Sequence, residues 1–195
     1  MLSYISALVL GIIEQKPVNP YEITKLLEKI EIRKWMPVAV SSIYTTVKEL
    51  NKKGYCEGMT EKDGNMPEKT VYSITGEGKR KLHESLREYL GSTDLDRKKF
   101  QISALLLCHL DREDAIKILH KKLAILDEIA ACLSQGAQAK QGKVPYIGLC
   151  MITHELAFVC AETKATRELL EGIQQDSNWN YFVLKDLMSL NKERE

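Results

Sequence analysis

The chain has 195 residues, of which 44% are hydrophobic and 28% are charged, as in an ordinary globular protein with one large or two small domains. Its formal net charge of +1 excludes a globally basic protein, so any attraction to DNA has to come from a local patch. The five cysteines are scattered and lack paired CxxC spacing, which excludes a disulfide framework. The apolar N-terminal run has no basic leader and is too short to span a bilayer, so we expect a cytoplasmic protein without a membrane partner.

Two amphipathic helices are predicted at the start of the chain. The first covers residues 2–14, where apolar side chains recur at helical spacing. Residues 16–20, Lys-Pro-Val-Asn-Pro, interrupt it because each proline restricts the residue before it. Pro20 then suits the first turn of a second helix over residues 21–31, and Asn19 is its expected N-cap.

The next predicted helix, residues 40–54, has the features of a DNA-recognition helix. Ile43, Val47 and Leu50 recur at spacings of four and three, so they share one face. The opposite face has small hydroxyls at its N-terminal end and lysines at its C-terminal end. Hydroxyls can approach base edges or phosphates, and lysines reach phosphate oxygens. The candidate DNA-binding residues of this helix are Ser41, Ser42, Tyr44, Thr45, Lys48 and Lys52.

The ends of this helix are also predicted. Ser41 or Ser42 can cap its start by accepting a backbone N–H, and Gly54 suits the left-handed conformation that ends it. An ordinary solvated helix with lysines on its outer face is the alternative interpretation of the same residues.

A β-hairpin is predicted after Gly54. Residues 55–60 and 70–74 are short segments rich in strand-forming residues, and a polar loop with glycine and proline lies between them. We interpret this hairpin as the wing of a winged helix, in which Lys69 contacts phosphate across the neighbouring minor groove.

A further helix is expected from Thr75, its N-cap, to Leu90. Its run of basic residues, 79–81, is interpreted as a solvated face rather than as part of the wing. Residues 91–93, Gly-Ser-Thr, mark the expected boundary between two domains, 1–90 and 91–195.

Resemblance to the PadR family of transcriptional regulators rests on short motifs in register. They are Tyr21-Glu22-Ile23 after a short apolar helix, Ser42-Ile43-Tyr44, Leu50, Gly54, and Val-Tyr-Ser-Ile-Thr-Gly-Glu-Gly at residues 71–78. The resemblance implies a winged helix-turn-helix DNA-binding domain in residues 1–90. For residues 91–195 it implies a helical dimerisation domain of the longer family type, with a small aromatic effector bound near the dimer interface.

Independently of the resemblance, residues 91–195 are predicted to be mainly helical. Helices are expected over residues 95–110, from Asp111 to about residue 134, over 144–174 and over 179–190, with a loop at 135–143. The second of these helices has two apolar stripes, which bury more surface than one neighbour can cover and so favour a homodimer. The stripes are Ile116, Leu119, Leu123, Leu126, Ala130 and Leu133, and beside them Ile118, Ile125, Ile129 and Cys132.

The sequence contains few residues that suggest a metal site or an effector-binding site. Cys150 and His154 have ligand spacing, but zinc needs three or four ligands, so we expect no metal, no cofactor and no enzymatic activity. A Cys-His hydrolase would also need a third orienting group, and no such motif appears. Trp35, Tyr146 and Trp179 are candidate effector-binding residues, although large aromatic side chains more often belong to a core or an interface.

The sequence therefore predicts a mainly α protein: an N-terminal winged helix-turn-helix with a two-stranded wing, and an all-helical C-terminal dimerisation domain. Its expected function is that of a homodimeric regulator of transcription, a repressor that binds double-stranded DNA and is released by a small-molecule effector. The alternative is a winged-helix module that binds other proteins and no DNA.

Overall fold

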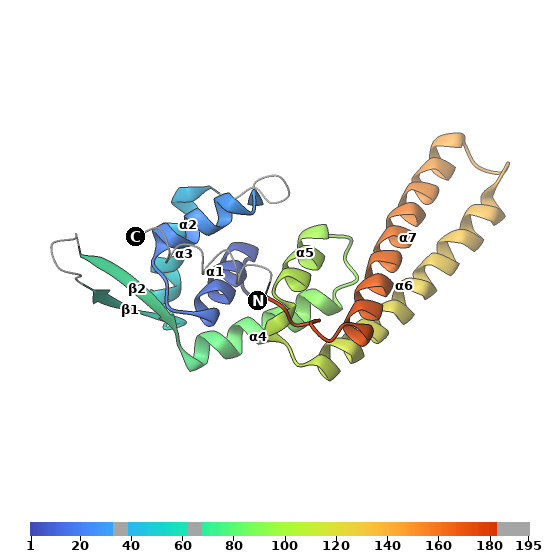
Figure 1. The fold of residues 1–195 in the computed structure, drawn as a ribbon. Helices are drawn as coiled ribbons and strands as arrows, with labels where there is room; N and C mark the ends of the chain where they lie inside the picture. Colours follow the sequence, from blue (N-terminus) through green and yellow to red (C-terminus); the bar gives the residue numbers. More distant parts are fainter. Residues whose placement is uncertain (33–38, 62–67, 183–195) are drawn as a thin grey trace.

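The computed structural model describes residues 1–32, 39–61 and 68–182, and every structural statement below concerns these residues. Helices α1 to α3 and a β-hairpin lie at one end, and the long helices α6 and α7 form an antiparallel pair at the other (Figure 1). Helices α4 and α5 connect the two ends. One apolar core runs from α1 into α7, and the division of the chain at residue 91 stays a prediction. None of the described helices has the length and apolar character needed to cross a membrane.

Helix α1, Tyr4–Gln15, is the centre of the first part of the chain, and residues 7–13 in it are all buried. The predicted second helix is confirmed as α2, Pro20–Lys29. Asn19 caps α2 reciprocally: its Oδ1 accepts from the Glu22 backbone N–H at 2.9 Å, and its Nδ2 donates to Glu22 Oε1 at 2.9 Å.

Helix α3, Val40–Lys52, is confirmed, but its predicted serine cap is wrong. The N-cap residue is Ala39, which makes no side-chain capping bond. The helix begins two residues earlier than a cap at Ser41 requires, so Ser41 and Ser42 lie inside its first turn. Gly54 has φ +72°, which confirms the left-handed end of this segment.

The hairpin is confirmed as β1, Cys56–Glu61, and β2, Lys69–Ile74. The strands are antiparallel, with Cys56 opposite Ile74 and Glu61 opposite Lys69. Val18 makes an isolated bridge to β2, because its N–H donates to the Tyr72 carbonyl at 3.1 Å and the Tyr72 N–H donates back at 3.0 Å. The connection between α1 and α2 is thereby fixed to the hairpin.

Helix α4, Gly76–Gly91, begins where α3 and β2 meet. The Thr75 hydroxyl accepts from the Gly78 N–H at 3.0 Å, as predicted, and donates to the Gly54 carbonyl at 2.6 Å. Gly78 lies so close to the turn after α3 that a Cβ there would be 1.9 Å from the Tyr55 carbonyl oxygen. The orientation of α3 relative to α4 therefore depends on a residue without a side chain.

The change Gly78→Ala is expected to lower the free energy of unfolding by about 3 kcal/mol, the upper end for overpacking, because backbone atoms have to move. The matched control is Gly76→Ala in the same helical turn, where nothing lies within 4 Å of an added Cβ. That change is expected to stabilise the fold by about 0.5 kcal/mol through the unfolded state. Urea denaturation of both variants measures the difference, and equal midpoints would contradict the close approach.

The second half consists of α5, Arg97–Leu105, the 3-10 helix η2, Leu107–His109, and two long helices. Helix α6 covers Arg112–Lys140 and begins at the predicted cap, where Asp111 Oδ1 accepts from the N–H groups of Glu113 and Asp114. Helix α7, Tyr146–Gln175, confirms the predicted long helix.

Two predictions for this half differ from the structure, and one of them also extends beyond the described residues. The loop expected at 135–143 is wrong, because α6 continues to Lys140 and includes Gly136. A single glycine costs a helix only about 1 kcal/mol, and packing against α7 offsets it. The helix expected at 179–190 is wrong at its start, because residues 179 and 180 belong to a turn at 177–180, and its residues from 183 on lie outside the described residues.

The seam between α6 and α7 contains a buried charge pair. Lys122 of α6 has only 1% of its side chain exposed, and its Nζ lies 2.6 Å from Oε1 of Glu162, which is 15% exposed. The ammonium also lies 5.5 Å from the centre of the Phe100 ring of α5. Leu119, Leu123 and Leu126 of the predicted seam are also buried.

Candidate nucleic-acid interface

The two faces of α3 are separated as predicted. Ile43, Val47 and Leu50 are buried against the core. Ser41, Tyr44, Thr45, Lys48 and Lys52 are exposed, and Ser42 is half-buried at the edge of the outward face. The helix packs on α1 and α2, so its outward residues are held by a rigid support rather than by a loop.

Hydroxyls and ammoniums are arranged in order along this face. The Thr45 hydroxyl donates to the Ser41 carbonyl at 3.1 Å, so its oxygen can still accept a hydrogen bond from a base edge. Lys48 and Lys52 follow at spacings of three and four residues toward the C-terminal end. Small groups at one end and long cations at the other suit a helix that inserts its N-terminal part into a major groove and reaches phosphates with the rest.

The basic residues of α3 and of α4 differ in whether they form ion pairs. In α4, Lys79 pairs with Glu14 of α1, Arg80 with Glu77 and Glu84, and Lys81 with Glu84. Lys79 and Arg80 are exposed, as expected for a solvated face, and these ion pairs offset its charge. In the part of the chain that the structure describes, neither Lys48 nor Lys52 takes part in an ion pair. The charge of α3 is therefore available to an external anion.

The wing contributes less charge than the helix. Lys69 is exposed at the start of β2, and its cross-strand neighbour in the register is Glu61, also exposed. A carboxylate opposite the lysine reduces its attraction to phosphate. Residues 62–67 at the tip lie outside the described residues.

The candidate effector residues do not come together. Trp35 lies outside the described residues. Tyr146 begins α7 and is 83% exposed, whereas Trp179 follows the end of α7 and packs against the core. A helix of 30 residues separates Tyr146 from Trp179 by about 45 Å, so these two side chains cannot line one cavity within a single chain.

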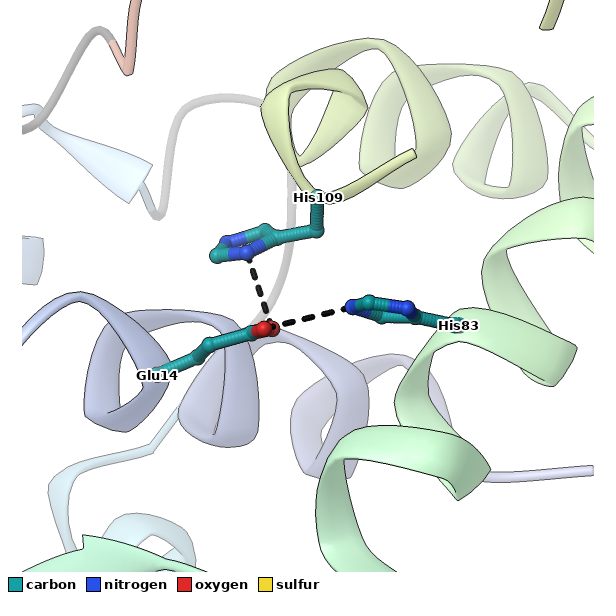
Figure 2. Close-up of side chains that lie close together, drawn as sticks. All are labelled: Glu14, His83 and His109. Atoms are coloured by element: carbon teal, nitrogen blue, oxygen red, sulfur yellow. Dashed lines mark hydrogen bonds and ion pairs between the residues drawn. The ribbon is translucent and has the colours of Figure 1, made fainter. Parts of the chain in front are cut away.

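Cys150 and His154 are both exposed on α7, and the His154 ring lies against Phe158 at a centroid distance of 4.9 Å. Among the described residues, the group of potential metal ligands that does come together contains neither of them. It consists of Glu14, His83 and His109 (Figure 2).

No pattern in the sequence predicts this group of three. Its members come from α1, α4 and η2, and His109 Nδ1 and His83 Nε2 lie 2.9 Å and 3.2 Å from the two oxygens of Glu14 (Figure 2). Burial alone would raise the pKa of Glu14, but His109, Lys79 and His83 outweigh it and lower this pKa to about 2. No local spacing signals the group, because its residues lie far apart in the chain.

Comparison with known proteins agrees with the helix-turn-helix arrangement and its motifs. Residues 9–84 match the transcriptional regulator PadR-like family. The negative transcriptional regulator PadR of Bacillus subtilis (strain 168) is 25% identical over 115 residues. That alignment covers 59% of this chain and 63% of the relative, so the chain spans less than two thirds of the regulator that it matches.

Similar solved structures include the same Bacillus subtilis PadR in two complexes. The complex with operator DNA is 20% identical, covers 88% of this chain and 99% of that chain, and has a TM-score of 0.43. The complex with p-coumaric acid is 17% identical, covers 89% and 100%, and has a TM-score of 0.40. The protein smu.1604c of Streptococcus mutans UA159 is 23% identical, covers 85% and 98%, and has a TM-score of 0.38. Residues 9–84 of this chain are therefore similar to the PadR-like family of transcriptional regulators.

Proposed function

We propose that this chain represses transcription by binding double-stranded DNA as a homodimer, with one α3 helix of each subunit in the major groove. The observation that supports this most is the outward face of α3, inside the family match at residues 9–84. Its Lys48 and Lys52 form no ion pair with another described residue. Ser41, Ser42 and Thr45 would lie closest to base edges. Tyr44, Lys48, Lys52 and the wing residue Lys69 would contact the phosphate backbone.

An apolar stripe on α7 supports the proposed dimer. Ile147, Met151 and Phe158 are separated by four and seven residues, so they share one face of the helix, and all three are exposed. Contiguous exposed apolar side chains are characteristic of interaction surfaces. A second copy of the chain is the proposed partner, because a two-fold axis places the same stripe on both subunits and gives two α3 helices for one duplex.

The proposed effector is a small aromatic compound bound near the dimer interface, as the resemblance to PadR regulators implies. Tyr146 precedes the apolar stripe directly and is exposed, so it is the candidate aromatic contact on this surface. Binding there would release DNA if it changed the angle between the subunits, since the two α3 helices must match one half-site spacing.

The test of the proposal is the double change Lys48→Ala with Lys52→Ala, followed by binding to DNA from upstream of the chain's own gene at several salt concentrations. Each lost phosphate contact reduces the slope of log K against log salt by about 0.9, so the double change is expected to reduce it by about 1.8. Affinity should fall similarly for all sequences, because phosphate contacts carry no sequence information directly.

Lys117→Ala with Lys164→Ala is the matched control, since it removes the same charge from exposed i,i+4 ion pairs on α6 and α7. Its slope should equal that of the unmodified chain. An unchanged slope in the α3 variant would contradict phosphate contacts from this face. Absence of DNA binding by the unmodified chain, even at low salt, would favour the protein-interaction module instead.

A further inference from the structure

We propose that Glu14, His83 and His109 form a binding site for a divalent transition metal ion, with Zn²⁺ as the ion that suits this ligand set best. Two imidazoles and one carboxylate are a set that zinc takes in proteins, with a fourth position left for water or another ligand. The proposal concerns the junction between α1, α4 and η2 and does not depend on DNA binding.

The distances between the three side chains suit one shared ion. The three potential ligand atoms all lie within 4.8 Å of one another. Ligands at the usual zinc distances of about 2.0–2.2 Å in a tetrahedron lie roughly 3.4 Å apart. The contacts of 2.9 Å and 3.2 Å to the two Glu14 oxygens are already close to that separation. Small side-chain rotations would therefore bring all three atoms around one centre, and Figure 2 shows both rings directed at the carboxylate.

The hydrogen bonding of the group is incomplete without an additional partner. Glu14 Oε2 and His109 Nδ1 are at ion-pair distance, yet Glu14 Oε2 accepts no properly aligned hydrogen bond from the described residues. His109 Nε2 is also buried and has no partner in the described part of the chain. Buried polar atoms without partners are few in native proteins, and an absent ion is one physical explanation for them.

The surroundings favour a cation at this position. His109 is buried, with the Phe182 ring at a centroid distance of 5.8 Å, so the site is shielded on one side by apolar surface. Lys79 Nζ lies 3.0 Å from Glu14 Oε1, but its side chain is 56% exposed. The lysine can therefore move into solvent when an ion supplies the positive charge in its place.

Metal binding would connect parts of the fold that are far apart in sequence. Glu14 is in the last turn of α1, His83 is in the middle of α4, and His109 ends η2, three residues before the start of α6. A bound ion would join the helices that support α3 to the base of the α6–α7 pair. Since a site formed only by folding adds its binding energy to stability, Zn²⁺ should raise the unfolding midpoint of the chain.

The test is calorimetric titration of the full chain with Zn²⁺, after chelator treatment and with a non-thiol reductant present. One ion per chain is expected to bind, and the change His83→Gln should weaken that binding by at least about 100-fold. This exceeds the 10–100-fold typical of residues that only support a ligand. His83 is chosen because it is partly exposed and so tolerates substitution better than His109.

The chain contains four histidines, which provides a matched control. His120→Gln with His154→Gln removes the two exposed histidines outside the group and should leave both the stoichiometry and the affinity unchanged. The thermal midpoint of the unmodified chain should rise with Zn²⁺ and return with chelator, and circular dichroism checks that His83→Gln is folded. Absence of binding to the unmodified chain, or equal binding by folded His83→Gln, would overturn the proposal.

Discussion

Replacing Glu162 by leucine is expected to lower the free energy of unfolding by about 3–5 kcal/mol, because it leaves the Lys122 ammonium buried without its counter-ion. Lys122 is 1% exposed, and its Nζ lies 2.6 Å from Glu162 Oε1 between α6 and α7. Leucine fills the space of the glutamate side chain, so the loss should come mainly from the uncompensated charge rather than from a cavity. Urea denaturation at one protein concentration measures it.

A second change should reverse this loss. Lys122→Met with Glu162→Leu removes both charges and places a thioether against the Phe100 ring, so stability is expected to return to within about 1 kcal/mol of the unmodified chain or to exceed it. Glu168→Leu is the control, since the Lys164–Glu168 pair is exposed and its contribution should not exceed about 0.5 kcal/mol. A single variant as stable as the unmodified chain would contradict the burial of Lys122.

Introducing charge on the α7 stripe is expected to abolish the proposed dimer and with it most of the DNA affinity. Met151→Asp with Phe158→Asp places two carboxylates on the exposed apolar stripe, where a second copy would have to bury them. A monomer binds one half-site only, and losing the linked second contact should weaken operator binding by about 10²–10⁴-fold. Sedimentation velocity gives the oligomeric state, and a gel-shift titration gives the affinity.

The control for this prediction adds the same charge elsewhere on the same helix. Thr153→Asp with Ala157→Asp substitutes two exposed residues that lie off the stripe, so the chain should remain dimeric and bind DNA normally. If the stripe variant also stayed dimeric and bound DNA, the two-fold contact would have to lie on another surface.

Local features of the sequence were sufficient to predict most elements of this fold. Asn19, Thr75 and Asp111 each cap the helix that they precede, because an acceptor side chain followed by a periodic apolar run is a local signal. The inner and outer faces of α3 followed from periodicity alone, since Ile43 and Val47 recur on one face and the residues opposite them are polar.

The errors arose where packing overrides a local signal. Gly136 predicts the end of a helix by propensity, yet α6 continues through it because α7 packs alongside. Ser41 and Ser42 are good capping residues, but α3 begins at Val40, which places both within its first turn. A local rule identifies residues that suit a helix cap or a helix end. Tertiary packing determines at which residue the helix begins or ends.

Contacts between distant residues could not be predicted from a single sequence. Lys122 occupies a helix position that looks solvated on its own, and only the neighbouring α7 explains its burial beside Glu162. The Glu14, His83 and His109 group likewise depends on three separate elements meeting. Among the candidate DNA-binding residues, most of those in α3 follow from its periodic outward face, whereas the contribution of Lys69 depends on a cross-strand neighbour, Glu61.

The most direct test of the proposed function is the mass of the unmodified chain, measured by sedimentation velocity, alone and with a duplex from its own upstream DNA. We expect a dimer in the absence of DNA and a complex that contains two chains per duplex at low salt, with binding weakened steeply as salt increases. A monomer at working concentration that forms no complex with this duplex at low salt would contradict the proposal.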